Sequence, residues 1–311
     1  MRKHRMFVLG AALVATALTV AACSDNGSGG DGDTGDGGTA DKGEITVGVS
    51  GAFTENQLVA EMYGQVLEND GYTVTRELDI ESRDVGNTAL ENGEIDLKPE
   101  YTGPDLLTYD PKADASGTPD EVAQRLADVV GQQGLVTYAI SPANSSNVFV
   151  TTQDVADQYS LTDISSLQPS AGDLTLGAPP DCPTNPFCAP GLKDVYGIEF
   201  ADIKKLDFGG RKTVAAIDSG EVQVGVLFSL TPIISEKGYV SLEDDEQMLA
   251  LGNFVPVVRQ EVASADLASV LDPVTTSLTD DEMIEMIASV DNDREDVEDV
   301  ALEYLQGKGL L

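Results

Sequence analysis

Short apolar runs alternate with amphipathic segments over the first half of the chain. Runs typical of buried strands lie at residues 45–50, 72–78 and 95–98. Apolar positions at helical spacing mark the segments at residues 55–69, 85–91 and 118–131. Thr54 stands where the first helix would take its N-cap, and Pro99 stands where the third strand would end. The alternation predicts an α/β layer whose strands are joined by right-handed crossovers.

The same alternation restarts near residue 147. Strands are predicted at residues 147–151, 174–178, 203–208, 222–228 and 254–258. Helices are predicted at residues 191–196, 213–219, 266–271, 279–289 and 296–306. A helix end, a Gly-Glu turn and a strand follow one another at residues 89–97 and again at 215–224. One such unit in each half indicates two lobes of similar construction.

Residues 1–22 have the pattern of a secretory signal peptide. Arg2, Lys3 and Arg5 precede an uncharged stretch that ends in small residues before Cys23. The tetrapeptide Val-Ala-Ala-Cys at residues 20–23 resembles the bacterial lipobox, in which the cysteine is lipidated and becomes the new N-terminus. The alternatives are an ordinary signal peptide followed by an incidental cysteine, and an uncleaved anchor.

The segment after Cys23 has the composition of a tether. Residues 24–42 carry no aliphatic side chain larger than alanine and consist mostly of Gly, Asp, Ser and Thr. Such a segment cannot bury enough apolar surface to fold. We therefore expect residues 23–43 to comprise a lipidated cysteine and a disordered tether that reaches roughly 25 Å.

Charge and histidine content exclude several classes of function. The net charge of −36 becomes −39 once Arg2, Lys3 and Arg5 leave with the signal peptide, which argues against binding of nucleic acid. The only histidine, His4, leaves as well, so Ser-His and Cys-His nucleophile pairs and most zinc sites are excluded. The sequence also lacks a Gly-x-Ser-x-Gly elbow and a phosphate-binding loop. We expect neither catalysis, nor a cofactor, nor a bound metal.

Two cysteines remain in the predicted folded body. Cys182 and Cys188 lie close together in a Pro-rich segment. In an oxidising compartment they are expected to form a disulfide that rigidifies this segment, and two free thiols are the alternative.

Four segments carry a resemblance to a known family. Residues 93–103, GEIDLKPEYTG, resemble the GEIDxxPEYTG segment of substrate-binding proteins from osmoprotectant ABC importers. Residues 49–56, VSGAFTEN, are similar to the GSKxFTEQ stretch of the same family. Residues 179–192, with Tyr196 and Gly197, resemble a variant of its lipoprotein members that includes the cysteine pair. Residues 222–229 resemble the strand before the family's Tyr-Ser position.

The resemblance implies an α/β, two-lobed type II periplasmic-binding-protein fold. Each lobe would be a mixed sheet flanked by helices, with a ligand cleft and a hinge between the lobes. Lobe I would comprise residues 44–148 and 255–311, and lobe II residues 149–254. The chain would cross near residue 148 and cross back near Phe254.

The resemblance also implies a site built from aromatic rings. A quaternary ammonium has no N–H to donate, so rings would hold it through cation–π attraction. Because the chain has no tryptophan, the rings must come from its 9 Tyr and 8 Phe. The candidate ligand-binding residues are Tyr101, Thr102, Phe53, Thr54, Phe228, Ser229, Asn147, Asp181, Asn185 and Phe187. Some relatives carry tyrosine where this chain has Val148 and Ala189, and the arginine expected before Pro190 is absent.

These features together predict a monomeric, extracytoplasmic solute-binding protein that is anchored to the cell membrane through lipidated Cys23. It would deliver glycine betaine, choline or a related quaternary amine to the permease of an ABC importer by closing its cleft. The alternatives are the same scaffold binding a different small solute, and a surface lipoprotein without a role in transport.

Overall fold

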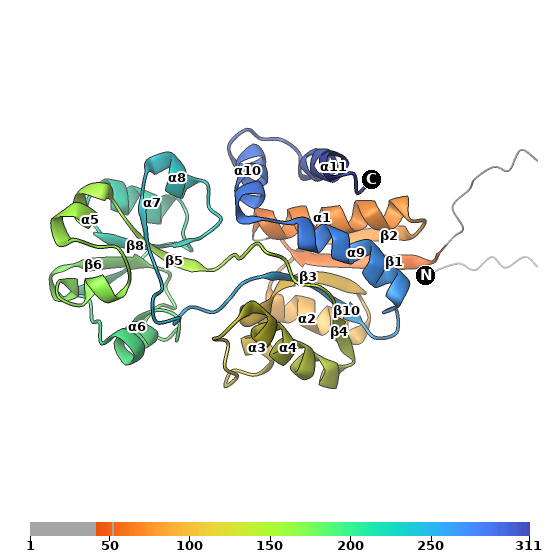
Figure 1. Ribbon diagram of the computed structural model, residues 1–311, viewed down its shortest axis with the longest axis horizontal. Helices are drawn as coiled ribbons and strands as arrows, with labels where there is room; N and C mark the ends of the chain where they lie inside the picture. Colours follow the sequence, from red (N-terminus) through yellow and green to blue (C-terminus); the bar gives the residue numbers. More distant parts are fainter. Residues whose placement is uncertain (1–41, 52) are drawn as a thin grey trace, which may run out of the picture. The chain divides into compact units, whose positions relative to one another are not determined.

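The computed structural model describes residues 42–51 and 53–311, which fold around two five-stranded sheets (Figure 1). The predicted signal peptide, Cys23 and most of the predicted tether lie outside the described residues. Within residues 42–51 and 53–311, no helix is both long and apolar enough to cross a membrane.

The first sheet has the strand order β2-β1-β3-β10-β4. Its strands are β1 (Glu44–Ser50), β2 (Thr73–Ile80), β3 (Leu97–Tyr101), β4 (Leu135–Thr137) and β10 (Phe254–Arg259). Strands β2, β1 and β3 run parallel, whereas β10 is antiparallel to both of its neighbours. The sheet is therefore mixed, and its one antiparallel strand comes from far along the sequence.

The second sheet repeats this plan with the order β7-β6-β8-β5-β9. Its strands are β5 (Asn147–Thr151), β6 (Thr175–Ala178), β7 (Asp202–Lys205), β8 (Val224–Phe228) and β9 (Val240–Leu242). Strands β7, β6 and β8 run parallel, and β5 is antiparallel to β8 and β9. The two lobes predicted from the recurring helix-turn-strand unit thus share one topology.

Helices cover both faces of each sheet, as Figure 1 shows for α1 and α9 on one side of the first sheet and α2 and α4 on the other. Those associated with the first sheet are α1 (Thr54–Asn69), α2 (Arg83–Asn92), α3 (Thr102–Tyr109), α4 (Pro119–Val130), α9 (Ala265–Ser277), α10 (Asp280–Asp291) and α11 (Val297–Lys308). Those associated with the second sheet are α5 (Gln153–Tyr159), α6 (Ala189–Tyr196), α7 (Arg211–Asp218) and α8 (Ile233–Lys237).

Burial on both faces explains why β8 reads as a continuous apolar run. In β8, Val224 and Val226 belong to the core on one face of the second sheet, and Leu227 belongs to the core on the other. Successive side chains of a strand point to opposite faces, so a strand covered on both sides favours apolar residues on both.

Two local predictions about the first sheet are wrong. Helix α1 begins at Thr54 with Phe53 as its N-cap, and the Thr54 hydroxyl donates to Asp291 Oδ1 at 2.7 Å instead of capping the helix. Strand β3 does not end at Pro99, which lies directly opposite Pro256 of β10. The Pro256 carbonyl accepts from the N–H of Tyr138 on its other side, so the two prolines occupy a non-hydrogen-bonded pair that requires no donor from either.

The chain passes between the sheets twice, at residues 138–146 and 243–253, and these crossing segments pair with each other. Asn144 and Asn253 form an antiparallel bridge, and the N–H of Ser145 donates to the Gly252 carbonyl at 3.0 Å. A Cβ atom on Gly252 would lie 1.7 Å from the Ser145 carbonyl oxygen. Only glycine therefore allows the two crossing segments to approach this closely.

Candidate functional site

A cavity of about 510 Å³ is lined by residues of both sheets and of the crossing segments. From the first sheet and its helices come Phe53, Glu55, Arg83, Tyr101, Pro104 and Leu107. From the second sheet and its loops come Asn147, Asp181, Asn185, Phe187, Phe208 and Phe228. Ser145 and Ser146, on the first crossing segment, lie between these two groups. Most of these residues follow the carboxyl ends of strands, which is where open α/β sheets bind ligands.

Five aromatic side chains contribute to the wall of this cavity: Phe53, Tyr101, Phe187, Phe208 and Phe228. The rings of Phe53 and Phe228 meet edge to face, with their centroids 5.2 Å apart and their planes at 79°. Phe53 precedes α1 and Phe228 ends β8, so this contact joins the two sets of elements. The cavity therefore presents aromatic surface from both of its sides.

Tyr101 is the most buried of these aromatic side chains, with 5% of its surface exposed. Its ring packs on Phe254 at a centroid distance of 5.2 Å, and its hydroxyl donates to Glu55 Oε1 at 3.1 Å. Burial raises the pKa of Tyr101 well above its ordinary value, and the neighbouring carboxyl of Glu55 adds to this shift. Tyr101 thus remains a neutral donor and offers the cavity only part of its ring.

Glu55 places a buried carboxyl group in the cavity wall. Its Oε1 accepts two hydrogen bonds of 3.1 Å, one from Tyr101 and one from the hydroxyl of Ser145. Burial raises the pKa of Glu55, although hydrogen bonds from its own backbone, Ser145 and Tyr101 oppose the shift. A cation bound nearby would stabilise the ionised form that burial disfavours.

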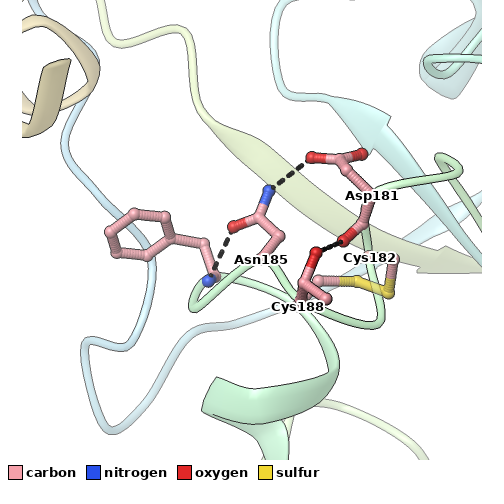
Figure 2. Close-up of a disulfide and its surroundings, with 6 residues drawn as sticks. Asp181, Cys182, Asn185 and Cys188 are labelled. Atoms are coloured by element: carbon pink, nitrogen blue, oxygen red, sulfur yellow. Dashed lines mark hydrogen bonds between the residues drawn. A yellow bond between two sulfur atoms is a disulfide. The ribbon is translucent and has the colours of Figure 1, made fainter. Parts of the chain in front are cut away.

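The predicted disulfide between Cys182 and Cys188 is present and shapes the loop that carries three candidate residues (Figure 2). The two Cα atoms lie 5.1 Å apart. Within the loop, the Asn185 amide donates to Asp181 Oδ2 at 3.0 Å, and the N–H of Phe187 donates to Asn185 Oδ1 at 2.9 Å. These bonds hold the polar groups and the Phe187 ring in one compact turn at the cavity.

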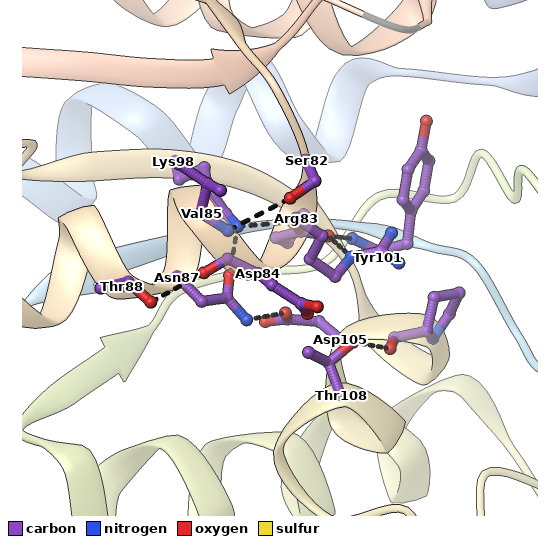
Figure 3. A network of polar contacts seen from close by, with 12 residues as sticks. Ser82, Arg83, Asp84, Val85, Asn87, Thr88, Lys98, Tyr101, Asp105 and Thr108 are labelled. Atoms are coloured by element: carbon purple, nitrogen blue, oxygen red, sulfur yellow. Dashed lines mark hydrogen bonds and ion pairs between the residues drawn. The ribbon is translucent and has the colours of Figure 1, made fainter.

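A buried charged network lies beside the cavity (Figure 3). Glu100 accepts from Arg83 Nε at 2.9 Å and pairs with Lys98 Nζ at 2.7 Å. Although burial opposes its ionisation, these two cations hold the pKa of Glu100 below its usual range. Lys98 also donates to Asn87, whose amide donates to Asp105 Oδ1 at 2.9 Å. Burial is the main cause that raises the pKa of Asp105 to about 7, and the charge of Glu100 is the second.

Three predicted site residues do not line the cavity: Thr54, Thr102 and Ser229. Thr102 is fully buried, and its hydroxyl donates to the Leu251 carbonyl at 3.1 Å. The Ser229 hydroxyl donates to the Asn144 carbonyl at 2.8 Å and accepts from the N–H of Ser146. Thr102 and Ser229 thus hold the two crossing segments, while Thr54 binds Asp291 as described above. The other seven predicted residues are among those lining the cavity.

Residues with functional groups in the cavity wall were also missing from the prediction, namely Phe208, Glu55, Arg83, Ser145 and Ser146. Phe208 follows β7, and an aromatic residue at the end of the strand predicted at residues 203–208 was the signal that could have identified it. Glu55 belongs to the Phe-Thr-Glu triplet that carried the family resemblance. Nothing in the local sequence around Arg83 distinguishes it from a solvent-exposed charge at a helix start.

Two mixed sheets, paired crossing segments and a cavity between the sheets define a two-lobed solute-binding protein. Residues 43–307 match the OpuAC family, described as the substrate binding domain of ABC-type glycine betaine transport systems, and the chain belongs to this family.

Named relatives agree with this assignment. The glycine betaine-binding protein YehZ of Escherichia coli is 25% identical over 268 residues, which cover 82% of this chain and 88% of that protein. A glycine-betaine-binding protein of Pseudomonas aeruginosa is 26% identical over 275 residues, which cover 83% of this chain and 86% of that protein. A solved glycine betaine/carnitine/choline ABC transporter structure superposes with a TM-score of 0.74 at 20% identity and covers 86% of this chain and 99% of its own. This structural likeness supports the two-lobed fold of the chain.

Proposed function

We propose that the chain binds a quaternary amine osmolyte, with glycine betaine as the first candidate, in the cavity between its two sheets. The observation that carries the proposal is the gathering of five aromatic side chains and the buried Glu55 carboxyl around one cavity. The aromatic faces attract a cation that cannot donate a hydrogen bond, with about 0.5–2 kcal/mol per ring. The names of the two curated relatives point to the same ligand.

The predicted lobe boundaries, 44–148 with 255–311 and 149–254, supply the moving parts of this proposal. Ligand would draw the lobes together about the crossing segments at residues 138–146 and 243–253, and the closed form would dock on the permease of an ABC importer. The Phe53–Phe228 contact, 5.2 Å between centroids, is one place where the two sides already meet. We further propose that the protein works outside the cytoplasm as a monomer, held at the membrane through lipidated Cys23.

The proposal assigns the cavity to binding without catalysis. Its polar side chains are a glutamate, an aspartate, an arginine, a tyrosine, two asparagines and two serines. None is a histidine, because the single histidine of the sequence, His4, lies in the predicted signal peptide. The wall also lacks the tyrosines that some relatives carry at the positions of Val148 and Ala189. A quaternary amine other than betaine, or a different small solute on the same scaffold, is therefore the alternative that an experiment should address.

Titration of the purified chain with betaine, choline, carnitine, proline betaine and a set of amino acids, followed by thermal unfolding, tests the proposal. A ligand at 100 times its dissociation constant should stabilise the folded state by about 2.7 kcal/mol. We expect quaternary amines to raise the melting temperature and amino acids to leave it unchanged. A shift with an amino acid and none with any quaternary amine would assign the cavity to another solute, and no shift at all would favour a surface lipoprotein.

A further inference from the structure

Arg83 occupies the boundary between the main cavity and a smaller one. The second cavity, of about 260 Å³, shares two lining residues with the first, Phe53 and Arg83. Arg83 is the first residue of α2, and Ser82 caps this helix by accepting the N–H of Val85. The backbone at Arg83 is thus fixed by a capped helix, and its side chain extends along the cavity wall.

The guanidinium of Arg83 is held by only one of its three nitrogens. Nε donates to Glu100 at 2.9 Å, while neither terminal nitrogen has a hydrogen-bond partner in the part of the chain that the structure describes. The Arg83 side chain is 30% exposed, and the central carbon of its guanidinium lies 5.8 Å from the centroid of the Tyr101 ring. The end of the guanidinium that can bind a carboxylate through two parallel bonds therefore remains available at the cavity.

The charge of Arg83 is only partly balanced by its surroundings. Glu100 lies between two cations, because Lys98 Nζ pairs with its other oxygen at 2.7 Å. Asp105, the next carboxyl of the network, bonds to Asn87 and acts on Arg83 through its charge, without a hydrogen bond between them. Two cations thus share one ionised carboxylate and one carboxyl whose pKa is raised to about 7, which leaves net positive charge while Asp105 is protonated. Of the two cations only Arg83 lines the main cavity.

An opposite pole lies in the same wall. The Glu55 carboxyl lines the main cavity and is bonded to the Tyr101 hydroxyl, while the Arg83 guanidinium lies over the ring of the same tyrosine. A carboxyl and a guanidinium thus flank one aromatic side chain. A ligand with a cation at one end and a carboxylate at the other matches this arrangement better than a ligand with a cation alone.

We propose that the terminal nitrogens of Arg83 bind the carboxylate of the ligand, which makes the cavity selective for quaternary amines that carry a carboxylate over those that end in an alcohol. This inference rests on the proposed function and specifies its ligand class.

Calorimetric titration of the purified chain with glycine betaine, its methyl ester and choline tests the inference. The ester keeps the cation and removes the negative charge, so the unaltered protein should bind betaine at least about 10-fold more tightly than the ester or choline. Arg83→Met should lower the affinity for betaine by about 10–100-fold, as expected for hydrogen bonds to a charged group. The same variant should leave the affinity for choline within about 3-fold.

Arg76→Met is the matched control, because Arg76 is paired with Glu61 and Glu68 and lines neither cavity. An equal loss for betaine and choline in Arg83→Met would mean that Arg83 only supports Glu100, and would overturn the inference, as would unchanged affinity for betaine. If Arg83→Met does not fold, the affinities of the unaltered protein for betaine and for its methyl ester provide the test, and equal affinities would overturn the inference. Tighter binding of choline than betaine overturns the inference alone, whereas no binding of any quaternary amine overturns the proposed function with it.

Discussion

The hydroxyl of Tyr101 donates a 3.1 Å hydrogen bond to Oε1 of Glu55 and so joins two segments that lie 46 positions apart in the sequence. The same oxygen accepts from Ser145 of the first crossing segment, also at 3.1 Å. One buried carboxyl group therefore links helix α1, strand β3 and the connection between the sheets. A change at this oxygen should affect both the stability of the protein and the ligand bound beside it.

Replacing Tyr101 by phenylalanine separates these two effects. The variant keeps the ring and its contact with Phe254 but removes one of two donors to a buried acceptor, which costs about 1–2 kcal/mol of unfolding free energy. Because Glu55 loses a bond that favours its ionised form, betaine affinity should fall a few-fold. Chemical denaturation and calorimetry measure the two quantities. Tyr101→Ala is less informative, since loss of the buried ring costs about 3–5 kcal/mol by itself.

Tyr159→Phe is the control for this experiment, because the Tyr159 hydroxyl has no hydrogen-bond partner among the described residues and lies outside the cavity lining. It should change neither stability nor affinity. Equal behaviour of the Tyr101 and Tyr159 variants would show that the bond to Glu55 contributes nothing measurable.

Phe208 offers a test of the aromatic wall that leaves the core intact. The side chain is 59% exposed, so Phe208→Ala should leave the melting temperature unchanged. Loss of one ring from the wall should weaken betaine binding by about 2–30-fold. Val195→Ala, another exposed apolar side chain outside the cavity, should alter neither property. Full affinity in Phe208→Ala would remove this ring from the proposed site.

Apolar patterning worked best for strands such as β8 and β10, which are buried on both faces and therefore stand out as apolar runs. It failed where tertiary context decides. Pro99 is tolerated within β3 because Pro256 lies opposite, a pairing between positions far apart in the sequence. The three-residue strands β4 and β9 were not predicted, since so short a segment carries no periodicity and gains its stability from the neighbouring strand.

Position along the strands identified some of the site residues but could not give the orientation of others. Phe53, Tyr101 and Phe228 follow or end strands, where sequence position alone places a side chain near the ligand edge of a sheet. The neighbouring hydroxyls of Thr102 and Ser229 face the crossing segments instead, because adjacent residues point in different directions. The orientation of Arg83 depends on Glu100 and Lys98 in β3, which no local pattern around Arg83 reveals.

The disulfide should matter for binding as well as for stability. It closes a loop of sequence separation 6, for which the chain-entropy model gives a stabilisation of about 2 kcal/mol. The double variant Cys182→Ala, Cys188→Ala should lose about this much in denaturant unfolding. It should also bind betaine more weakly, because Phe187 and Asp181 belong to the loosened loop. A reducing agent should reproduce the binding defect in the unaltered protein and have no effect on the double variant.

Gly252 should be intolerant of any side chain. A Cβ atom there would lie 1.7 Å from the Ser145 carbonyl oxygen, a backbone atom that cannot move without breaking the pairing of the crossing segments. Gly252→Ala should therefore destabilise the protein by more than about 2 kcal/mol or change the closure of the lobes. Gly131→Ala is the control, because its Cβ would meet nothing within 4 Å, and it should be neutral or slightly stabilising. Comparable melting temperatures for Gly252→Ala and Gly131→Ala would contradict the close approach of Gly252 to Ser145.

The raised pKa of Glu55 predicts how pH acts on the protein without ligand. Burial lifts this pKa above its ordinary value of 4.5, so the folded state binds the proton more tightly than the unfolded state does. The stabilising contribution is complete below the unfolded pKa and is lost as pH rises through the folded one. Glu55→Gln cannot ionise and should show a smaller decline of stability as pH rises above 4.5.

The ligand should reverse this trend, because a bound cation favours the ionised carboxylate. The increase in melting temperature produced by a fixed, saturating concentration of betaine should therefore grow as pH rises from about 4.5 upward, and should stay constant in Glu55→Gln. Asp105, whose pKa burial and Glu100 raise to about 7, also ionises above pH 4.5 but does not line the cavity. Asp105→Asn should thus change the decline of stability while the betaine-dependent increase still grows with pH. A pH-independent effect of betaine on the unaltered protein would show that Glu55 does not interact with the ligand's cation.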